Sequence, residues 1–286
     1  MLRETFLFRA CDKCLELGLR TRLMGVVNVT PDSFSDGGRY FSAQEAIDRC
    51  LQIVDEGADL IDIGGESTRP GSNPVSAHEE LERILPVIEA VRPLVPVMIS
   101  VDTYKSRVAE EALTAGADVI NDISSFRFDP GIAEVVAQSS AGVILMHCRG
   151  TPSTMHQLPP SADIIRDVCE GLQIAVNTAY KSGIDRDRIV VDPGIGFGKN
   201  AVENLQILNR LRFLEEMGLP LLVGPSRKRF IESVLGLPVD QRIVGTVAAA
   251  VVAVLNGAHM LRVHDVAEVH QATQVTDAIL SEALPE

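Results

Sequence analysis

Short apolar runs alternate with amphipathic segments along almost the whole chain. Each run has five or six residues and is rich in β-branched side chains, which is typical of buried parallel strands. The predicted strands are 23–28, 60–64, 97–102, 118–122, 142–147, 189–194, 221–226 and 260–264.

In the segments between these runs, apolar residues recur with a helical period. The segment that begins at Ser42 has Glu45 three residues later, the spacing of a capping box, and Gly57 follows its end. A second segment repeats this spacing with Ser76 and Glu79. The other predicted helices are 104–116, 129–139, 162–183, 201–218, 241–257 and 266–284.

Eight strands that are each followed by a helix predict an α/β fold, a (β/α)8 TIM barrel. An open doubly wound sheet could alternate in the same way, but eight regular units without a linker favour closure. Residues 1–21 precede the first strand, and we expect this N-terminal extension to cap the barrel floor. We therefore expect residues 1–286 to form a single domain.

Composition supports a globular protein with a large core, since 46% of residues are hydrophobic and 23% are charged. No apolar run reaches the roughly 18 residues that a membrane-spanning helix needs, and the longest, 244–255, is predicted to be a buried or interface helix. Arg9 and Asp12 interrupt the apolar part of the N-terminus, which argues against a signal peptide. We therefore expect a cytoplasmic protein with no membrane partner.

The formal net charge of −13 disfavours nucleic acid as a partner, because such binding depends on clustered Lys and Arg. It leaves room for a small anion held by local basic residues. Cys11 and Cys14 form a C-x-x-C pair, but no second pair follows at a zinc-site spacing. We interpret them as reduced thiols near an N-terminal turn or helix.

Polar residues gather at the carboxyl ends of the predicted strands. In a barrel these ends point to one face, which carries the active site. A single Asp there is often only a helix cap, but nine polar residues on one face are hard to explain by capping. They are Asn28, Asp62, Asp102, Asn121, Asp122, His147, Asp192, Arg262 and His264.

Two connections, 28–41 and 64–75, are longer than ordinary βα loops and rich in Gly, Pro and Ser. Because they also contain Asp36 and Arg69, they are predicted to be lids over the barrel mouth rather than surface loops without a role.

The glycine-rich segment 192–200 fits neither common nucleotide-binding motif. The dinucleotide fingerprint requires Gly where Lys199 stands, and a P-loop requires other residues than Pro193 and Asn200. The segment is predicted to be a βα loop that brings backbone close to a ligand.

Basic residues follow the last two predicted strands. Loops at this point of barrels often bind anions, and a helix N-terminus adds N–H donors. An ordinary solvated helix face remains an alternative for Arg227 and Arg229. The predicted anion site comprises Ser226, Arg227, Lys228, Arg229, Arg262 and His264, with Arg69 closing over it.

Asp102, Asn121 and Asp192 offer carboxylate and amide groups opposite this anion site. A heterocycle with several N–H donors and ring nitrogens would satisfy them in one plane. Asn28 supplies an oxygen that could hold Mg²⁺, which commonly bridges substrate phosphates.

These motifs resemble those of the dihydropteroate synthase family, from about Leu23 to Val266. The two long matches are MGVVNVTPDSFSDGG and GADLIDIGGESTRPGS. Five shorter matches follow in order: SVDTYKSRVAEEAL, GADVINDIS, DPGIGFGK, SRK and RVHDV.

The resemblance implies a (β/α)8 transferase of folate biosynthesis that is usually a homodimer, a target of sulfonamides and assisted by Mg²⁺. Such an enzyme condenses 6-hydroxymethyl-7,8-dihydropterin pyrophosphate with p-aminobenzoate and releases 7,8-dihydropteroate and pyrophosphate. Loss of pyrophosphate leaves a pterin cation that the arylamine attacks, while the lids exclude water.

The resemblance also implies site residues, by motif position. The pterin would contact Asp102, Asn121, Ile123, Met146, Asp192, Phe197, Gly224 and Lys228. The pyrophosphate would contact Asn28, Arg69, Arg262 and His264, with Mg²⁺ at Asn28. The aminobenzoate would contact Phe34, Ser35, Thr68, Pro70, Phe197 and Arg229. The catalytic residues would be Asp102, Asp36, Lys228 and Arg262.

One position departs from part of the family, because some members have Ser where this chain has Arg229. Three other functions deserve comparison. A pterin-dependent methyltransferase barrel would share the pterin pocket without needing a pyrophosphate site. A non-catalytic pterin-binding paralogue would have degraded motifs. An aldolase-like barrel would need a Schiff-base Lys at a strand end, whereas Lys228 lies beyond its strand.

Overall fold

The computed structural model describes residues 3–30, 38–155 without 68–73, and 157–284. Its centre is a parallel sheet of eight strands in the order β8-β7-β6-β5-β4-β3-β10-β9. A bridge between Val191 and Leu221 joins the two ends of this sheet. The predicted TIM barrel is therefore confirmed. The strands are β3 (Arg22–Asn28), β4 (Leu60–Gly64), β5 (Met98–Asp102), β6 (Val119–Asp122), β7 (Gly142–Met146), β8 (Ile189–Asp192), β9 (Leu222–Val223) and β10 (Met260–Val263).

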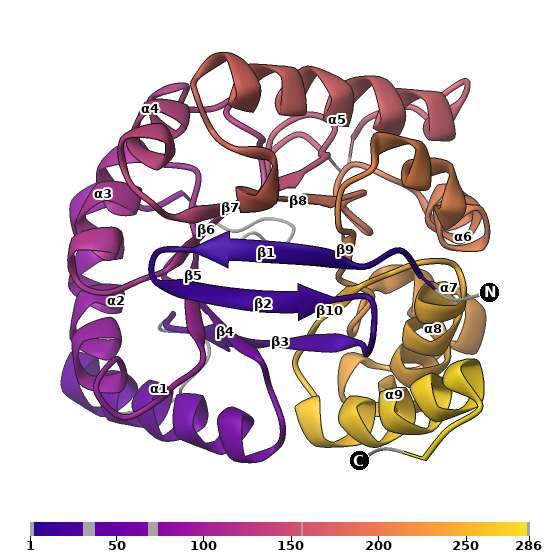
Figure 1. Ribbon diagram of the computed structural model, residues 1–286, viewed down its shortest axis with the longest axis horizontal. Helices are drawn as coiled ribbons and strands as arrows, with labels where there is room; N and C mark the ends of the chain where they lie inside the picture. The colour runs from indigo at the N-terminus through magenta and orange to yellow at the C-terminus, as the bar shows by residue number, and fades with distance from the viewer. Residues whose placement is uncertain (1–2, 31–37, 68–73, 156, 285–286) are drawn as a thin grey trace.

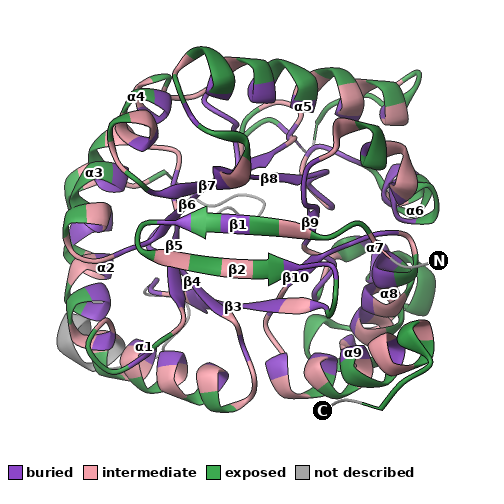
Figure 2. Cartoon of the chain, viewed as in Figure 1, coloured by how far each residue is buried: buried purple, intermediate pink, exposed green. Residues whose placement is uncertain are grey.

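Helices form a ring around the strands (Figure 1) and turn their buried residues toward them (Figure 2). This arrangement follows from the helical period of the apolar positions. The helices are α1 (Gly38–Asp55), α2 (Ala77–Val91), α3 (Ser106–Thr114), α4 (Gly131–Gln138), α5 (Ile164–Lys181), α6 (Ala201–Asn209), α7 (Arg229–Leu235), α8 (Ile243–Leu255) and α9 (Val266–Ser281). None of the helices in the described part of the chain has the length and apolar character of a membrane span.

Some element ends differ from the prediction. Helix α1 begins at Gly38, so position 42 lies inside it and not at its start. In contrast, Ser76 does cap α2, since its hydroxyl accepts a hydrogen bond from the Glu79 N–H. The predicted helix 201–218 breaks at Arg210, whose φ of −111° is not helical, and continues as a 3-10 helix.

Strand β9 is also shorter than the predicted 221–226. It spans only Leu222–Val223. Pro225 follows two residues later, and a proline cannot donate a ladder hydrogen bond, so the pairing ends early.

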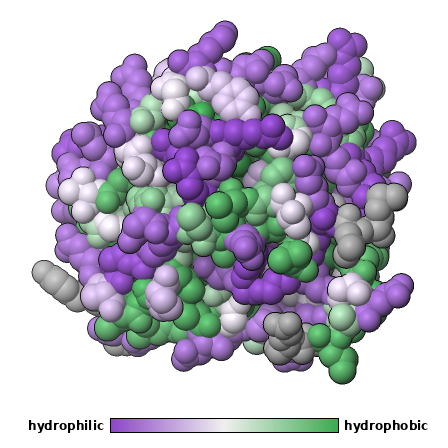
Figure 3. Space-filling model, viewed as in Figure 1, coloured by the Kyte–Doolittle hydropathy of each residue, from purple (hydrophilic) through white to green (hydrophobic). Residues whose placement is uncertain are grey.

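The N-terminal extension forms a hairpin of β1 (Phe6–Ala10) and β2 (Lys13–Leu17) across the barrel floor (Figure 1). Phe8, Ala10 and Leu17 are fully buried against the lowest inward-pointing residue of each barrel strand. A Cβ on Gly142 would lie 2.5 Å from the Phe8 ring, so this glycine makes room for the aromatic side chain. The expected floor cap is therefore confirmed. In space-filling form this face is largely hydrophilic, with hydrophobic residues reaching the surface near its middle (Figure 3).

The thiols of the C-x-x-C pair lie on this hairpin, and both are exposed. Cys11 is in the turn, with a positive φ of 55°, and Cys14 is in β2. Within the described ranges, no group of three or more His, Cys, Asp or Glu is arranged for a metal ion.

His259 connects the extension to the barrel. Its Nδ1 accepts a hydrogen bond from the Leu221 N–H at 3.1 Å, and its Nε2 donates to the Glu4 carbonyl at 3.0 Å. The ring also meets Phe6 edge-on at 5.1 Å. Only the neutral imidazole can accept and donate in this way. Burial lowers the pKa of His259 to about 4.

We expect this contact to make stability depend on pH. The unfolded chain binds a proton at His259 near pH 6.5, whereas the folded protein resists protonation down to about pH 4. Stability is therefore lost as pH falls, and His259 should contribute about 2 kcal/mol to the decrease in free energy of unfolding between pH 7 and pH 5. Urea unfolding at both values checks this. The variant His259→Gln should be less stable at pH 7 but show a decrease smaller by that amount. An equal decrease in both proteins would contradict the assignment.

Candidate active site

The barrel mouth is built by the alternation of side chains along each strand. The inward residues nearest the floor are apolar, and the next inward residues toward the carboxyl ends are mostly polar. Strand register then brings the polar residues together, because Gly64 pairs with Asp102 and Asp102 pairs with Asn121. The inward polar residues above the floor are Asp62, Ser100, Asn121, Asp192 and Arg262, with Asp102 one level higher on β5.

Arg262 lies at the centre of this polar layer. Its Nε donates to Asp62 at 2.6 Å, and its Nη2 donates to Asp102 at 2.7 Å. The Asn121 amide also donates to Asp62, at 3.1 Å. One guanidinium therefore bridges two carboxylates from neighbouring strands. Burial acts to lower the pKa of Arg262, but Asp62 and Asp102 raise it above its usual value.

Two oxygens in this layer are buried without a hydrogen-bond partner among the described residues. They are Asp62 Oδ1 and Ser100 Oγ. Buried polar atoms are nearly always paired in folded proteins, so these two are ready to receive donors from a bound molecule or water. The mouth is therefore suited to a polar ligand that carries N–H groups.

The carboxyls of the mouth have raised pKa values. Burial raises the pKa of Asp102 to about 7, although Arg262 opposes the rise. Burial likewise raises the pKa of Asp192 to about 6, against the hydrogen bond that Asp192 accepts from the Gly194 N–H at 2.6 Å. Strongly shifted groups in a cleft are typical of functional sites.

Lys228 approaches the same carboxylates from the start of α7. Burial lowers its pKa to about 8, and Arg262 acts in the same direction. Its ammonium lies 4.2 Å from the centre of the Phe197 ring. A Cβ on Gly196 would come within 3.0 Å of the Lys228 side chain, so glycine at 196 leaves space for this lysine.

The glycine-rich loop after β8 is held from within by Lys199. Gly194, Gly196 and Gly198 all have positive φ, which glycine adopts without strain. The Lys199 ammonium donates to the carbonyls of His147, Gly194 and Phe197 at 3.0, 2.8 and 3.1 Å. Lys199 therefore fixes the loop, and the Gly194 N–H lies 2.6 Å from the Asp192 carboxylate of the mouth.

An apolar cluster lies beside the polar layer. Ile123, Met146 and Cys148 are buried there, and Tyr104, Phe128 and Phe197 pack against them. A flat ligand that hydrogen-bonds the polar layer along its edge could place its faces against such side chains.

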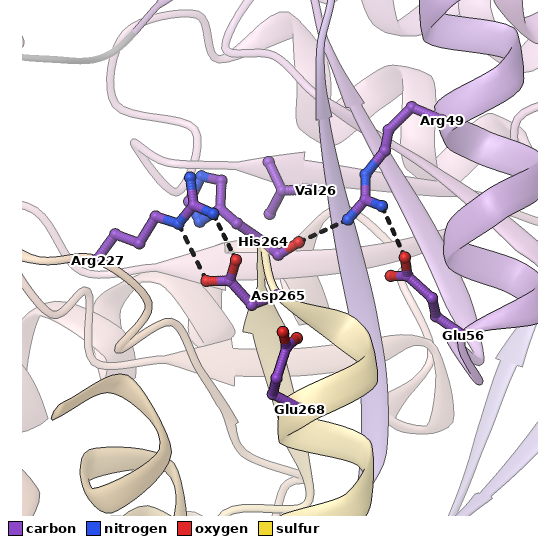
Figure 4. A pocket seen from close by; sticks show the side chains of 7 residues that line it. All are labelled: Val26, Arg49, Glu56, Arg227, His264, Asp265 and Glu268. Atoms are coloured by element: carbon purple, nitrogen blue, oxygen red, sulfur yellow. Dashed lines mark hydrogen bonds and ion pairs between the residues drawn. The ribbon is translucent and has the colours of Figure 1, made fainter. Parts of the chain in front are cut away.

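His264 lines a cavity of about 370 Å³ (Figure 4). Ser226 Oγ is 3.0 Å from His264 Nδ1. Burial lowers the pKa of His264 to about 3, so its ring is neutral at pH 7. The other residues lining the cavity are Val26, Arg49, Glu56, Arg227, Asp265 and Glu268. Arg49 donates to the His264 carbonyl at 2.7 Å and thus ties α1 to this site.

Several predicted residues lie elsewhere or point elsewhere. Asp122 and His147 are at strand ends, as predicted, but face outward. Asp122 accepts hydrogen bonds from Ser124 and from the Phe126 N–H, while the His147 ring packs on Gly171 of α5. Arg227 is exposed and pairs with Asp265, and Arg229 is exposed on α7. Gly224, in contrast, lies beside a residue of the polar layer, because a Cβ at this position would be 3.8 Å from Arg262.

The two predicted lids fall largely outside the described residues. This applies to Phe34, Ser35, Asp36, Thr68, Arg69 and Pro70. The base of the second connection is described. Glu66 accepts hydrogen bonds from Lys105 and from the Tyr104 hydroxyl, both at 2.5 Å, and from the Val75 N–H at 3.3 Å. Glu66 therefore holds the two ends of this connection to the segment that follows Asp102.

Sequence reasoning placed Asp62 on the active-site face but gave it no specific contact, and it assigned no role to Lys199 or Glu66. Asp62 lies two positions before Gly64, the end of β4, so both positions face the same side of the sheet. Lys199 was treated only as a mismatch to nucleotide motifs, although a lysine that ends a glycine-rich loop can bind its carbonyls.

For Mg²⁺, the described residues offer a limited set of ligands. Asn28 ends β3, and its Oδ1 lies 3.9 Å from the position of a Cβ on Gly64, near Asp102. A single amide oxygen fits an ion that is bound mainly through substrate phosphates and water.

Comparisons with known proteins show which family this chain resembles. A family model described as pterin binding enzyme matches residues 24–264. The dihydropteroate synthase of Synechocystis sp. is 47% identical over 263 residues, which cover 92% of this chain and 91% of that protein.

Solved structures resemble the whole fold. Xanthomonas albilineans dihydropteroate synthase with 4-aminobenzoic acid has a TM-score of 0.91 and 42% identity, covering 99% of this chain and 100% of that one. Yersinia pestis dihydropteroate synthase in complex with a sulfonamide drug has a TM-score of 0.90 and 43% identity, covering 96% and 100%.

Proposed function

The chain belongs to the dihydropteroate synthase family of pterin-binding enzymes, and we propose here the part that its residues play in dihydropteroate synthesis. The enzyme is a transferase that joins 6-hydroxymethyl-7,8-dihydropterin pyrophosphate to p-aminobenzoate and releases 7,8-dihydropteroate and pyrophosphate. The observation that carries the assignment of residues is the Arg262 bridge between Asp62 and Asp102, in a mouth with unpaired buried oxygens.

The pterin would bind in the polar layer. Asp102, Asn121 and Asp192 would accept or exchange hydrogen bonds with its ring N–H groups, and Lys228 would donate to a ring acceptor. Ile123, Met146, Phe197 and Gly224 would lie against the ring. Asp62 joins this set, because its Oδ2 accepts from Asn121 and Arg262 while its Oδ1 is buried without a partner among the described residues. Binding would favour the ionised carboxylates over their protonated forms.

The pyrophosphate would bind at the edge of this layer next to His264. Arg262 supplies a permanent positive charge, and neutral His264 can donate one hydrogen bond from Nε2 while Nδ1 stays with Ser226. Asn28 would hold Mg²⁺, which when bound supplies charge neutralisation to the phosphates. Arg69 completes the set from outside the described residues.

The aminobenzoate would bind beside Phe197, within reach of Arg229 and the start of α7. Its remaining contacts, Phe34, Ser35, Thr68 and Pro70, lie outside the described residues. A structural neighbour with 4-aminobenzoic acid and another with a sulfonamide drug support the proposal that this chain binds p-aminobenzoate here and is a sulfonamide target.

Cleavage of the bond between the pterin and the pyrophosphate creates two charges that the site must stabilise. Arg262 and His264 would stabilise the departing pyrophosphate, and Asp102 with Asp36 would stabilise the pterin cation. The arylamine is already a nucleophile, so a strong base is unnecessary. Because Arg262 contacts Asp102, departure of the anion and formation of the cation are coupled through one ion pair.

We also propose a cytoplasmic homodimer. Helix α8 supports the dimer, because Val244, Val252 and Leu255 are 76%, 41% and 44% exposed on an otherwise apolar helix. An interface across this face would bury side chains that water otherwise surrounds.

Pyrophosphate release tests the function and the metal together. The protein is mixed with dihydropterin pyrophosphate, with and without p-aminobenzoate, in Mg²⁺ or in excess chelator. Release should depend on p-aminobenzoate and yield dihydropteroate, and the chelator should slow it at least about tenfold, reversibly on Mg²⁺ addition. Tight pterin binding without product would favour the non-catalytic paralogue. Full activity in chelator would contradict the metal proposal alone.

A further inference from the structure

The turn that presents Lys228 contains a residue in an unfavourable backbone conformation. Arg227 has a φ of +57°, in the left-handed region that non-glycine residues rarely adopt. It stands between Ser226, which contacts His264, and Lys228, which faces the carboxylates of the mouth. Left-handed residues at such places persist only where neighbouring groups hold them.

Thr246 of α8 and Arg242, the residue just before α8, bind the N–H and the carbonyl of Arg227. The Arg227 N–H donates to Thr246 Oγ1 at 3.0 Å, and the Arg227 carbonyl accepts from Arg242 Nη1 at 3.2 Å. Thr246 is fully buried and Arg242 is 6% exposed, so neither bond competes freely with water. Arg242 is itself fixed by the Leu237 carbonyl at 3.0 Å and by Glu232 at 2.7 Å.

The side chain of Arg227 is anchored on the opposite side. Its guanidinium pairs with Asp265 at the start of α9, one residue after His264 (Figure 4). The turn is thus held by α8 at its backbone and by α9 at its side chain. This arrangement leaves the backbone of residue 227 little freedom to change its conformation.

The conformation of Arg227 decides where Lys228 points. Lys228 has extended backbone angles, φ −70° and ψ 154°, and α7 begins with the next residue. If Arg227 returned to the ordinary right-handed region, the peptide plane before Lys228 would rotate. The lysine would then leave its position 4.2 Å from the Phe197 ring, and Ser226 would be displaced from His264.

We propose that Thr246 and Arg242 are positioning residues for the reaction, which clamp Arg227 in its left-handed conformation and thereby aim Lys228 at the pterin. The inference rests on the proposed role of Lys228. Neither Thr246 nor Arg242 touches the substrate in this arrangement. They act through the turn, from a helix whose other face is exposed.

The test compares side chains of equal shape. Thr246→Val keeps the volume and removes the hydroxyl, so the Arg227 N–H loses its acceptor. Binding of dihydropterin pyrophosphate, measured by calorimetry, should weaken about tenfold. Thr246→Ser should bind within about twofold of the unchanged protein, because it restores the acceptor. If the valine variant does not fold, the affinities of Thr246→Ala and Thr246→Ser are compared instead, because these two small side chains also differ in the hydroxyl.

The matched control is Thr273→Val in α9. Thr273 is 2% exposed, and its hydroxyl donates to the His270 carbonyl at 3.0 Å, so a similar buried hydrogen bond is lost away from the turn. This control should lower the melting temperature without changing pterin affinity.

Unchanged affinity in both Thr246→Val and Thr246→Ala would overturn the proposal, and so would an equal loss in Thr273→Val. Failure of the unchanged protein to turn over would instead count against the proposed function.

Discussion

Replacement of Asp102 by alanine is expected to lower kcat/KM by about 10³-fold while the barrel stays folded. Asp102 links the proposed pterin and pyrophosphate sites, since its carboxylate accepts a hydrogen bond from Arg262 at 2.7 Å. Alanine removes both the pterin contact and the negative charge next to the developing pterin cation. Arg262 keeps its bond to Asp62 at 2.6 Å, so no buried charge is left entirely alone. For this reason the fold should survive the change.

Steady-state pyrophosphate release measures the loss of kcat/KM. Circular dichroism and thermal unfolding show whether the barrel stays folded. Asp59→Ala is a matched control, because Asp59 is a largely buried carboxylate at the floor end, paired with Arg22 at 2.9 Å. That variant should lose stability and keep its kcat/KM within about threefold. Normal turnover in Asp102→Ala would show that the pterin does not bind at this carboxylate.

The fold was predictable because its signals are local. Each strand run has the length and β-branched content that a buried parallel strand requires, and eight strands followed by helices leave few architectures. The details that were missed depend on geometry. A Ser-x-x-Glu spacing at Ser42 occurs inside a helix as well as at its start, and only the three-dimensional path shows that α1 begins at Gly38.

The sequence predicted which residues form the site better than it predicted the contacts between them. Strand parity is enough to place Asp102, Asn121 and Asp192 on one face. It does not show that Arg262, assigned to the anion site, also lies between Asp62 and Asp102, since these two residues are 200 and 160 positions away in the chain. Their contact depends on the pairing of β10 with β3 and on the register of that pairing. The left-handed conformation of Arg227 could not be predicted either, because its sequence does not differ from that of an ordinary helix start.

Replacement of Arg262 by alanine should abolish measurable pyrophosphate binding and also weaken the fold. The fully buried Asp62 and its neighbour Asp102 would lose the cation that compensates them. Removing one partner of a buried ion pair typically costs 3–5 kcal/mol, so the free energy of unfolding should fall by about 3 kcal/mol, given that Arg262 is partly accessible. Calorimetry with pyrophosphate and Mg²⁺, together with urea unfolding, measures both effects.

Two variants separate the loss of the anion contact from the loss of stability. Arg262→Lys keeps a positive charge but cannot bridge two carboxylates with a planar fork, so it should recover part of the stability and little of the pyrophosphate affinity. Arg92→Ala breaks a floor ion pair, 2.8 Å from Asp118, and should lower stability without affecting pyrophosphate. If Arg262→Ala binds pyrophosphate as well as the unchanged protein, then Arg262 serves only to neutralise the carboxylates, and the anion must be held by the residues around His264 alone.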